Sequence, residues 1–205
     1  MSQQYDDHKL IVITAPSGAG KTSITRHLMQ TFPDLAFSVS ATTRAPRKNE
    51  TEGKDYYFIS REQFEEKISQ NAFVEWEMVY EGLYYGTLHD EIKKMWAAGK
   101  IPILDIDVKG AMNIKNLYPR QTLTLFIAPP SMEALKERLE KRGTDAPESI
   151  QKRLNKAAFE LSFQERFDQI ILNDRLEEAC QMAAATLRLF LQPQSLDSKE
   201  EIMKK

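Results

Sequence analysis

The sequence predicts a three-layer α/β fold, in which helices flank a core of parallel sheet on both faces. A small inserted β-rich lobe and a helical lid are added to this core. Strand-like apolar runs alternate with helical patterns near both ends of the chain, which is typical of βαβ units. Residues 39–87 lack that alternation and instead carry short strand patterns separated by glycine turns, which predicts that the inserted lobe is antiparallel. Two helical patterns then meet at an arginine-containing turn near residue 142, which predicts the lid.

Bulk properties narrow the class of protein. The chain has 205 residues, a net charge of −2 and one cysteine, Cys180. This length predicts one domain, and the charge gives no general affinity for nucleic acid or anionic membranes. One cysteine excludes an internal disulfide and a Cys-based metal site. The polar residues 1–9 are not a secretory signal and no apolar run is long enough to cross a membrane, so a cytoplasmic protein is expected. Whether it is a monomer or a homo-oligomer stays open.

The first strand and helix enclose a phosphate-loop motif. The apolar run Leu10–Thr14 predicts a buried strand, and a helical pattern follows over residues 22–32. Between them lies the P-loop segment Ala15-Pro-Ser-Gly-Ala-Gly-Lys-Thr22. Its glycines, Gly18 and Gly20, let backbone N–H groups point inward as an anion nest. Lys21 can reach the β- and γ-phosphates of a nucleotide such as ATP, and Thr22 can offer its hydroxyl to Mg²⁺. Ala15 replaces the usual first glycine, so its φ must be negative.

The middle of the chain predicts short strands. They are expected at residues 37–40, 55–59 and 73–79, the last continuing through aromatic residues and glycine turns to 87. Residues 41–54 predict a loop. Ser60 and Gln63 have capping-box spacing for a helix to about residue 70. Alternation in the third strand puts Glu75 and Glu77 on the face opposite Val74, Trp76 and Met78, either as the wet face of a hairpin or as a polar site.

The βα rhythm then returns. Helices are expected at residues 90–98, 108–117, 132–141 (capped by Ser131), 148–163 and 176–191, with strands at 101–107, 123–128 and 169–172. Asp105 and Asp107 end the strand at 101–107 with i, i+2 spacing, which predicts the same side. Ligands in open α/β sheets bind outside the carboxyl ends of strands, so these acids suit Mg²⁺ or its waters. Residues 192–205 are polar and are expected to be flexible.

Two groups of arginines remain ambiguous from local pattern alone. Arg44 and Arg47 flank Pro46, a stiff spacing that suits two guanidinium groups aimed at one anion. Arg138, Arg142 and Arg153 bracket the turn between two helices, as in a lid over a phosphoryl group. Locally, ordinary surface arginine is the better interpretation of both groups.

An ordered set of motifs extends from about Lys9 to Leu191 and resembles guanylate kinase of the bacterial type. The matching blocks, in chain order, are Ala15–Thr22, Ser38–Ser40, Thr42–Arg47, Gly53–Tyr56, Phe73–Trp76, Tyr84–Thr87, Ile103–Asp107 and Phe126–Pro130. The resemblance implies a core (residues 9–38, 88–130 and 160–191), a GMP-binding lobe (39–87) and a lid (about 131–159). It also gives the arginines a shared target.

The resemblance implies a role for each site residue. Around the GMP phosphate it puts Arg44, Arg47, Tyr56 and Tyr85, and around guanine Ser40, Glu75 and Thr87. Glu50, Gly86, Asp105 and Asp107 complete the substrate site, the two aspartates at its floor. For ATP it implies Ala15, Pro16, Ser17, Gly18, Ala19, Gly20, Lys21, Thr22 and Asn173, with Thr22 also holding the metal. The implied catalytic residues are Lys21, Arg44, Arg138, Arg142 and Arg153.

The implied reaction moves the γ-phosphoryl group of ATP to GMP, giving ADP and GDP with Mg²⁺, in purine nucleotide supply and GMP recycling. The ligand chemistry agrees, because a carboxylate such as Glu75 can accept from N1–H and N2–H of guanine, whereas adenine has the reverse pattern. Two alternatives stay open: a kinase for another nucleoside monophosphate, and a non-catalytic binding module with this fold. The intact Lys21 and Thr22 argue against the module.

Overall fold

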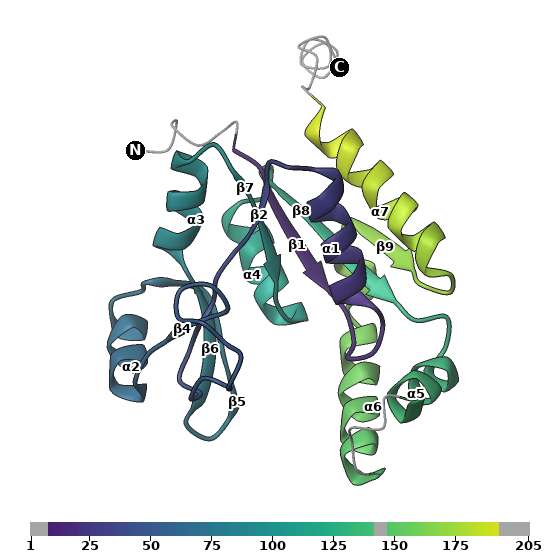
Figure 1. The fold of residues 1–205 in the computed structure, drawn as a ribbon, viewed down its shortest axis with the longest axis horizontal. Coiled ribbons are helices and arrows are strands. Elements are labelled where there is room, and N and C mark those ends of the chain that lie inside the picture. The colour runs from purple at the N-terminus through teal and green to yellow at the C-terminus, as the bar shows by residue number, and fades with distance from the viewer. Residues whose placement is uncertain (1–7, 142–146, 193–205) are drawn as a thin grey trace, which may run out of the picture.

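The core of the molecule is a parallel five-stranded sheet. The computed structural model describes residues 8–141 and 147–192, and its sheet has the order β2-β7-β1-β8-β9 (Figure 1). Its strands are β1 (Leu10–Thr14), β2 (Leu35–Phe37), β7 (Ile101–Asp105), β8 (Thr122–Ala128) and β9 (Gln169–Leu172). Every neighbouring pair is parallel. All carboxyl ends therefore meet at one edge, where the segments after β1, β7 and β9 come together.

Helices cover both faces of this sheet, which confirms the predicted three-layer α/β fold. Alternate residues of β1 point to opposite faces. Ile11 and Ile13 pack with α1 (Lys21–Thr31) and α7 (Leu176–Leu191), whereas Leu10 and Val12 pack with α3 (His89–Ala97) and α4 (Val108–Leu117). These β1 side chains are fully buried. The strand is thus apolar on both sides, as a central parallel strand requires.

The inserted lobe is a second, four-stranded sheet with the order β4-β3-β6-β5. It comprises β3 (Ala41–Thr42), β4 (Tyr57–Phe58), β5 (Phe73–Tyr80), β6 (Leu83–Leu88) and helix α2 (Arg61–Ser69). Phe64 of α2 stacks on Phe73 and Tyr84, with ring centroids 4.3 and 5.1 Å apart. The capping box of Ser60 and Gln63 is confirmed. The lobe thus has its own small core beside the main sheet (Figure 1).

Several predicted boundaries in this half of the chain were wrong. The strand expected at residues 37–40 is β2, which ends at Phe37, and the strand expected at 55–59 is only Tyr57–Phe58. Two residues of the expected loop at 41–54 form β3, and β3 pairs parallel with β4, so the lobe is mixed rather than antiparallel. These strands of two or three residues depend on long-range partners: Tyr57 N donates to Ser40 O at 2.9 Å. No local sequence pattern indicates such a partner.

The strand expected to run to Asp107 ends at Asp105. Asp107 is instead the N-cap of α4, and its Oδ1 accepts from Gly110 N at 2.7 Å. The i, i+2 argument for a common side therefore fails, because Asp107 is not part of the strand. A short acidic side chain is favoured as N-cap because it binds free amide groups of the first turn.

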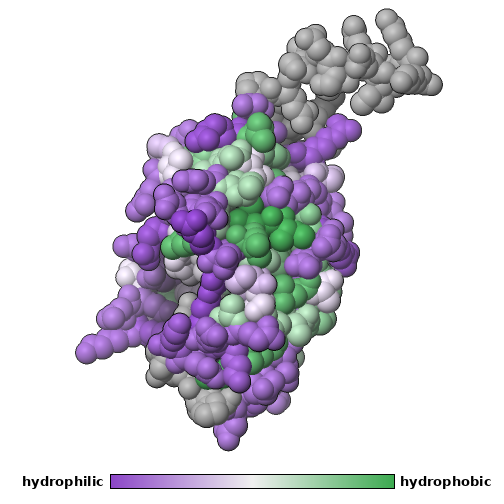
Figure 2. Space-filling model, turned by 90° about the vertical axis from the view of Figure 1, so that its right-hand side faces the viewer, coloured by the Kyte–Doolittle hydropathy of each residue, from purple (hydrophilic) through white to green (hydrophobic). Residues whose placement is uncertain are grey.

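The remaining helices lie beside the phosphate loop and along the sheet edge. Helix α5 (Met132–Lys141) is capped by Ser131, as predicted, and is followed by α6 (Pro147–Leu161) and the short 3₁₀ helix η1 (Gln164–Arg166). The side that carries α7 and β9 has apolar residues at its surface (Figure 2). Exposed residues there are Leu172, Leu176, Met182 and Leu189. No helix of the described residues is long and apolar enough to span a membrane, and the predicted flexible tail lies outside them apart from Gln192.

Candidate active site

The phosphate loop has a backbone shape that only its glycines adopt easily. Gly18 and Gly20 both have φ 96°, in the left-handed region. Ala19 N donates to Pro16 O at 3.0 Å, and α1 begins directly after Gly20, its N-cap. Ala15 is buried and does not have a positive φ, as predicted; within residues 8–141 and 147–192, Asn71 is the non-glycine residue with a positive φ. The loop therefore opens the N-terminus of α1 toward any bound anion.

Residues behind the loop hold this shape. Asn173 is buried at the end of β9, and its Nδ2 donates to Ala19 O at 2.7 Å. Arg138 of α5 donates to Asn173 O at 2.9 Å and to Asp174 O at 3.3 Å. A Cβ atom on Gly18 would lie 3.1 Å from Leu139 Cδ2, so α5 packs directly under the loop. Asn173 and Arg138 thus brace the loop from behind.

A cavity of about 500 Å³ lies between the loop, the lobe and α6. Its lining residues are Ala15, Pro16, Ser17, Gly18, Gly20, Lys21, Thr22, Ser23, Phe37, Ser40, Asp55, Tyr56, Glu75, Glu77, Val79, Tyr85, Gly86, Asp105, Ile106, Asp107, Arg153, Lys156 and Glu160. Most of the expected site residues are among them. Those that do not line it are Ala19, Arg44, Arg47, Glu50, Thr87, Arg138 and Asn173. The expected residue Arg142 lies outside the described ranges.

At the lobe end of the cavity, Glu75 and Thr87 form a buried pair. Glu75 is 7% exposed, and Thr87 Oγ1 donates to its Oε1 at 2.6 Å. A Cβ atom on Gly110 of α4 would lie 2.9 Å from Glu75 Oε2, so the missing side chain makes room for the carboxyl group. Burial raises the pKa of Glu75 to about 7. Thr87 thus fixes the position of one carboxyl oxygen of Glu75. Hydrogen bonds donated by a ligand to the carboxyl group would favour its charged form.

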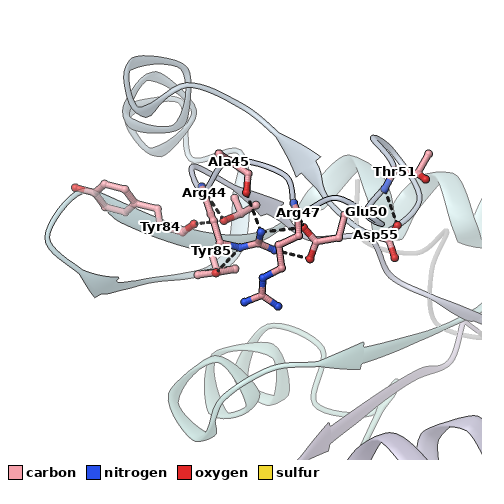
Figure 3. Close-up of polar contacts among 9 residues, drawn as sticks. Arg44, Ala45, Arg47, Glu50, Thr51, Asp55, Tyr84 and Tyr85 are labelled. Carbon is pink, nitrogen blue, oxygen red and sulfur yellow. Dashed lines mark hydrogen bonds and ion pairs between the residues drawn. The ribbon is translucent and has the colours of Figure 1, made fainter. Parts of the chain in front are cut away.

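A second polar cluster surrounds Arg44 on the loop between β3 and β4 (Figure 3). Its guanidinium donates from Nη1 and Nη2 to the two oxygens of Glu50, both at 2.8 Å, and from Nε to Tyr85 OH at 3.2 Å. Glu50 also accepts from the backbone N of Arg47 at 2.7 Å. These donors lower the pKa of Glu50 to about 2. Tyr56 lies under the Arg44 guanidinium, 5.4 Å from ring centroid to Cζ, and the Arg47 guanidinium points away from Glu50 (Figure 3).

Lys21 and Arg153, the cations beside the phosphate loop, also have partners within the chain. Lys21 forms an ion pair with Asp105 at the end of β7, which lies beside β1 in the sheet. Arg153 of α6 donates to Ser17 Oγ at 2.9 Å. Thr22 is exposed at the start of α1 and lines the cavity. The arrangement brings two cations and a hydroxyl to the mouth of the anion nest, which suits a nucleotide polyphosphate.

The sequence did not single out three charged residues of the cavity wall as site residues. Glu77 hydrogen-bonds Asp107, and burial together with that contact raises the pKa of Glu77. Lys156 and Glu160 of α6 lie 3.9 Å apart, and burial raises the pKa of Glu160 to about 6. A signal for two of them was present: Glu77 shares the face of Glu75, and Glu160 follows Arg153 by two helical turns.

Comparisons with known proteins give the family of this chain. The guanylate kinase family model matches residues 7–195. The chain belongs to the guanylate kinase family. It is 46% identical to a guanylate kinase of Chlorobium luteolum, over 89% of this chain and 92% of that protein. It is 48% identical to one of Chlorobium chlorochromatii, over 89% and 96%. A crystal structure of guanylate kinase from Anaplasma phagocytophilum matches with TM-score 0.71 and 32% identity, covering 91% of this chain and 88% of that one.

Membership of the guanylate kinase family also bears on the fold. The similarity to a solved guanylate kinase extends over the sheet core and beyond it, since nine-tenths of the chain is covered. The α/β fold with a phosphate loop at the carboxyl end of β1 is therefore the fold of this family as well as of this chain. Family membership does not itself assign roles to the individual side chains.

Proposed function

We propose that this member of the guanylate kinase family transfers the γ-phosphoryl group of ATP to GMP, giving ADP and GDP, with Mg²⁺. One observation carries the proposal: a single cavity is lined both by the phosphate loop and by the carboxylate that Thr87 holds at the lobe end, Glu75. A polyphosphate site and a base-reading site in one cavity suit a reaction between two nucleotides.

Base choice follows from hydrogen-bond chemistry at the lobe end. Guanine has donors at N1 and N2 and an acceptor at O6. Glu75 Oε2 and the shared Oε1 accept from these two donors, while the Ser40 hydroxyl, which lines the same cavity, donates to O6. Adenine would set an acceptor against the carboxylate. Sites built on such hydrogen bonds reject the mismatched analogue by ~10⁴-fold or more.

Two separate groups of residues recognise the phosphates, one for GMP and one for ATP. Arg44 and Arg47, with the hydroxyls of Tyr56 and Tyr85, bind the GMP phosphate next to the loop between β3 and β4. Lys21 and the N–H groups from Ala15 to Thr22 bind the ATP phosphates, so Lys21 leaves Asp105 when ATP enters. Gly86 lines the cavity with its backbone, and a Cβ there would lie 2.9 Å from the Phe73 and Trp76 side chains on the other face of the strand, so glycine lets these side chains pack close to β6.

Mg²⁺ fits this site as an ion that arrives with ATP. No group of three or more His, Cys, Asp or Glu side chains suited to a metal occurs among the described residues. Magnesium in kinases is held by one or two protein oxygens together with substrate phosphates and waters, which Thr22 and Asp105 can provide. When bound, the ion neutralises charge on the transferred group.

The transfer needs no protein nucleophile. It needs the GMP phosphate aligned with the γ-phosphate and cations where charge develops. Arg153 already reaches the loop through Ser17, and we assign Arg138 and Arg142 to the same lid, which would close with the lobe to exclude water. In the described structure Arg138 braces Asn173, so its catalytic part would begin only after closure.

The decisive experiment measures ADP release from Mg·ATP with GMP, AMP, CMP and UMP in turn. We expect turnover with GMP at least ~10⁴-fold above the others in kcat/KM. Turnover with a different monophosphate would establish another kinase. GMP binding by calorimetry without turnover would establish a binding module. A Lys21→Ala variant controls for contaminating kinases, since its ADP release should be close to background.

The product is a precursor of GTP, so we propose a part in purine nucleotide supply and in recycling of GMP. Both substrates are small nucleotides of the cytoplasm, where we expect the protein. We propose no nucleic-acid or membrane partner, because the net charge of −2 gives no attraction to polyanions.

A further inference from the structure

Glu77 lies in the cavity one rung away from the base-reading pair. In the β5–β6 ladder Glu75 is opposite Thr87, Trp76 is opposite Gly86, and Glu77 is opposite Tyr85. Alternate residues of a strand share a face, so the two pairs form successive rungs on the cavity face, ~7 Å apart. Glu77 and Tyr85 both line the cavity.

The exposure of its neighbours gives independent evidence for the face of β5 on which Glu77 lies. Trp76 and Met78, the neighbours of Glu77 in β5, are 46% and 49% exposed on the opposite face of the strand. Glu77 is half-buried and hydrogen-bonds Asp107, the N-cap of α4, which also lines the cavity. Lys109 of α4 and Lys156 of α6 are its nearby cations, and Glu75 and Glu160 its nearby acids. Glu77 is thus directed at the ligand space and not at solvent.

The order of contacts along the ladder fixes which part of the ligand meets this rung. On the proposed function, guanine meets the Glu75–Thr87 rung, and Tyr85 reaches forward to Arg44, the phosphate-binding residue, at 3.2 Å. The part of a nucleotide between base and phosphate is the ribose. Its hydroxyl groups are the hydrogen-bond donors available there, and carboxylates commonly accept from ribose hydroxyls in nucleotide sites.

We propose that Glu77 accepts a hydrogen bond from a ribose hydroxyl of GMP and makes the site prefer the ribonucleotide over its deoxy analogues. The inference rests on the proposed function. The ribose hydroxyls are donors, and the Glu77 carboxylate is an acceptor on the wall that this part of the ligand meets. A deoxynucleotide that lacks the hydroxyl leaves this acceptor without a donor from the ligand.

The test compares kcat/KM for GMP, 2′-deoxy-GMP and 3′-deoxy-GMP in the full chain and in Glu77→Ala and Glu77→Gln variants. We expect Glu77→Ala to lower the value for GMP ~10–100-fold, as for loss of one hydrogen bond to a charged group, while the value for at least one deoxy analogue changes less than threefold. Glu77→Gln keeps an acceptor and can donate to Asp107, so it should keep most of the preference. The KM for ATP should not change in either.

Met78→Ala is the matched control, because Met78 is exposed on the outer face of the same strand. It should leave the selectivity unchanged, and thermal melting checks that all variants fold. The inference is overturned if Glu77→Ala changes GMP and both deoxy analogues by the same factor, or changes none. Absence of GMP turnover in the wild type would instead refute the proposed function, so the two failures are distinguishable.

Discussion

Replacing Glu75 with glutamine tests how the site reads the base. Glu75 is buried, and the Thr87 hydroxyl donates to Oε1 at 2.6 Å. Because Thr87 donates to Oε1 in the structure, we expect the amide oxygen of the Glu75→Gln variant to take that position. The amide NH₂ then occupies the place of Oε2 and faces the N–H donors of guanine. The substitution keeps the shape of the side chain and reverses one hydrogen-bonding atom.

The size of the effect follows from that reversal. Loss of a hydrogen bond to a charged group, with a stranded donor beside it, costs ~2–4 kcal/mol. At ~1.4 kcal/mol per factor of ten, kcat/KM for GMP should fall ~30- to 1,000-fold. AMP should lose less, or gain, because adenine N1 can accept from the amide. The GMP-to-AMP ratio of kcat/KM should therefore fall steeply.

The same variant should be more stable than the wild type at pH 8. The pKa of Glu75 is about 7 in the fold, against 4.5 for the free group. Because the folded pKa is the higher one, the folded state binds more protons between these values, and wild-type stability falls as pH rises from about 4.5 to 7. At ~1.4 kcal/mol per pKa unit, the charged, buried carboxylate costs on the order of 3 kcal/mol at pH 8.

The assay measures kcat/KM for both substrates, and urea unfolding at pH 8, in wild type and variant. An unchanged GMP-to-AMP ratio would mean that Glu75 does not read the base, and the guanine site would lie elsewhere. A variant less stable than wild type at pH 8 would refute the argument that the buried charge is costly. The two results are independent, because selectivity is a ratio and does not depend on the amount of folded enzyme.

Four further predictions follow from named contacts. Lys21→Ala should lower kcat more than ~100-fold with unchanged melting temperature, since Lys21 contacts ligand and Asp105 rather than core. The KM for GMP should fall between pH 6 and 8 as Glu75 ionises, and the Glu75→Gln profile should be flatter. Gly110→Ala should raise the KM for GMP ~10-fold without loss of stability, because the new Cβ lies 2.9 Å from Glu75 Oε2 while helix propensity improves; Asn113→Ala, exposed in the same helix, should not. X-ray scattering should show a smaller radius of gyration with a bisubstrate analogue, and an unchanged radius would exclude closure of lobe and lid.

Elements with local signals were predictable from the sequence. Helix α7 and strands β1 and β9 have the predicted bounds, because a long apolar stripe or a short apolar run between breakers marks each of them. Helix α2 was marked by its capping box. The two-residue strands β3 and β4 were not predictable, since pairing across the lobe, and not propensity, makes them strands.

The residues of the candidate site also differ in whether a local sequence signal made them predictable. The phosphate loop is contiguous, so its motif gave the nest, the lysine and the following helix together. The cavity wall is not contiguous in the sequence: Glu77 of β5 and Lys156 and Glu160 of α6 line one cavity only because the fold brings these two elements to it. Sequence periodicity shows which residues share a face, but it does not say which face of α6 borders the cavity.

Two cations of the site form ion pairs with carboxylates of the same chain. Arg44 is held by both oxygens of Glu50, and Lys21 by Asp105. These carboxylates keep the cations in fixed positions, so less side-chain entropy is lost when a phosphate arrives. A phosphate must also compete with a carboxylate for each cation, which weakens binding of any ligand that carries less charge. A nucleoside without phosphate has nothing to exchange for these pairs. The pairing thus favours nucleotides over nucleosides before any base contact is made, while Glu75 selects among the nucleotides.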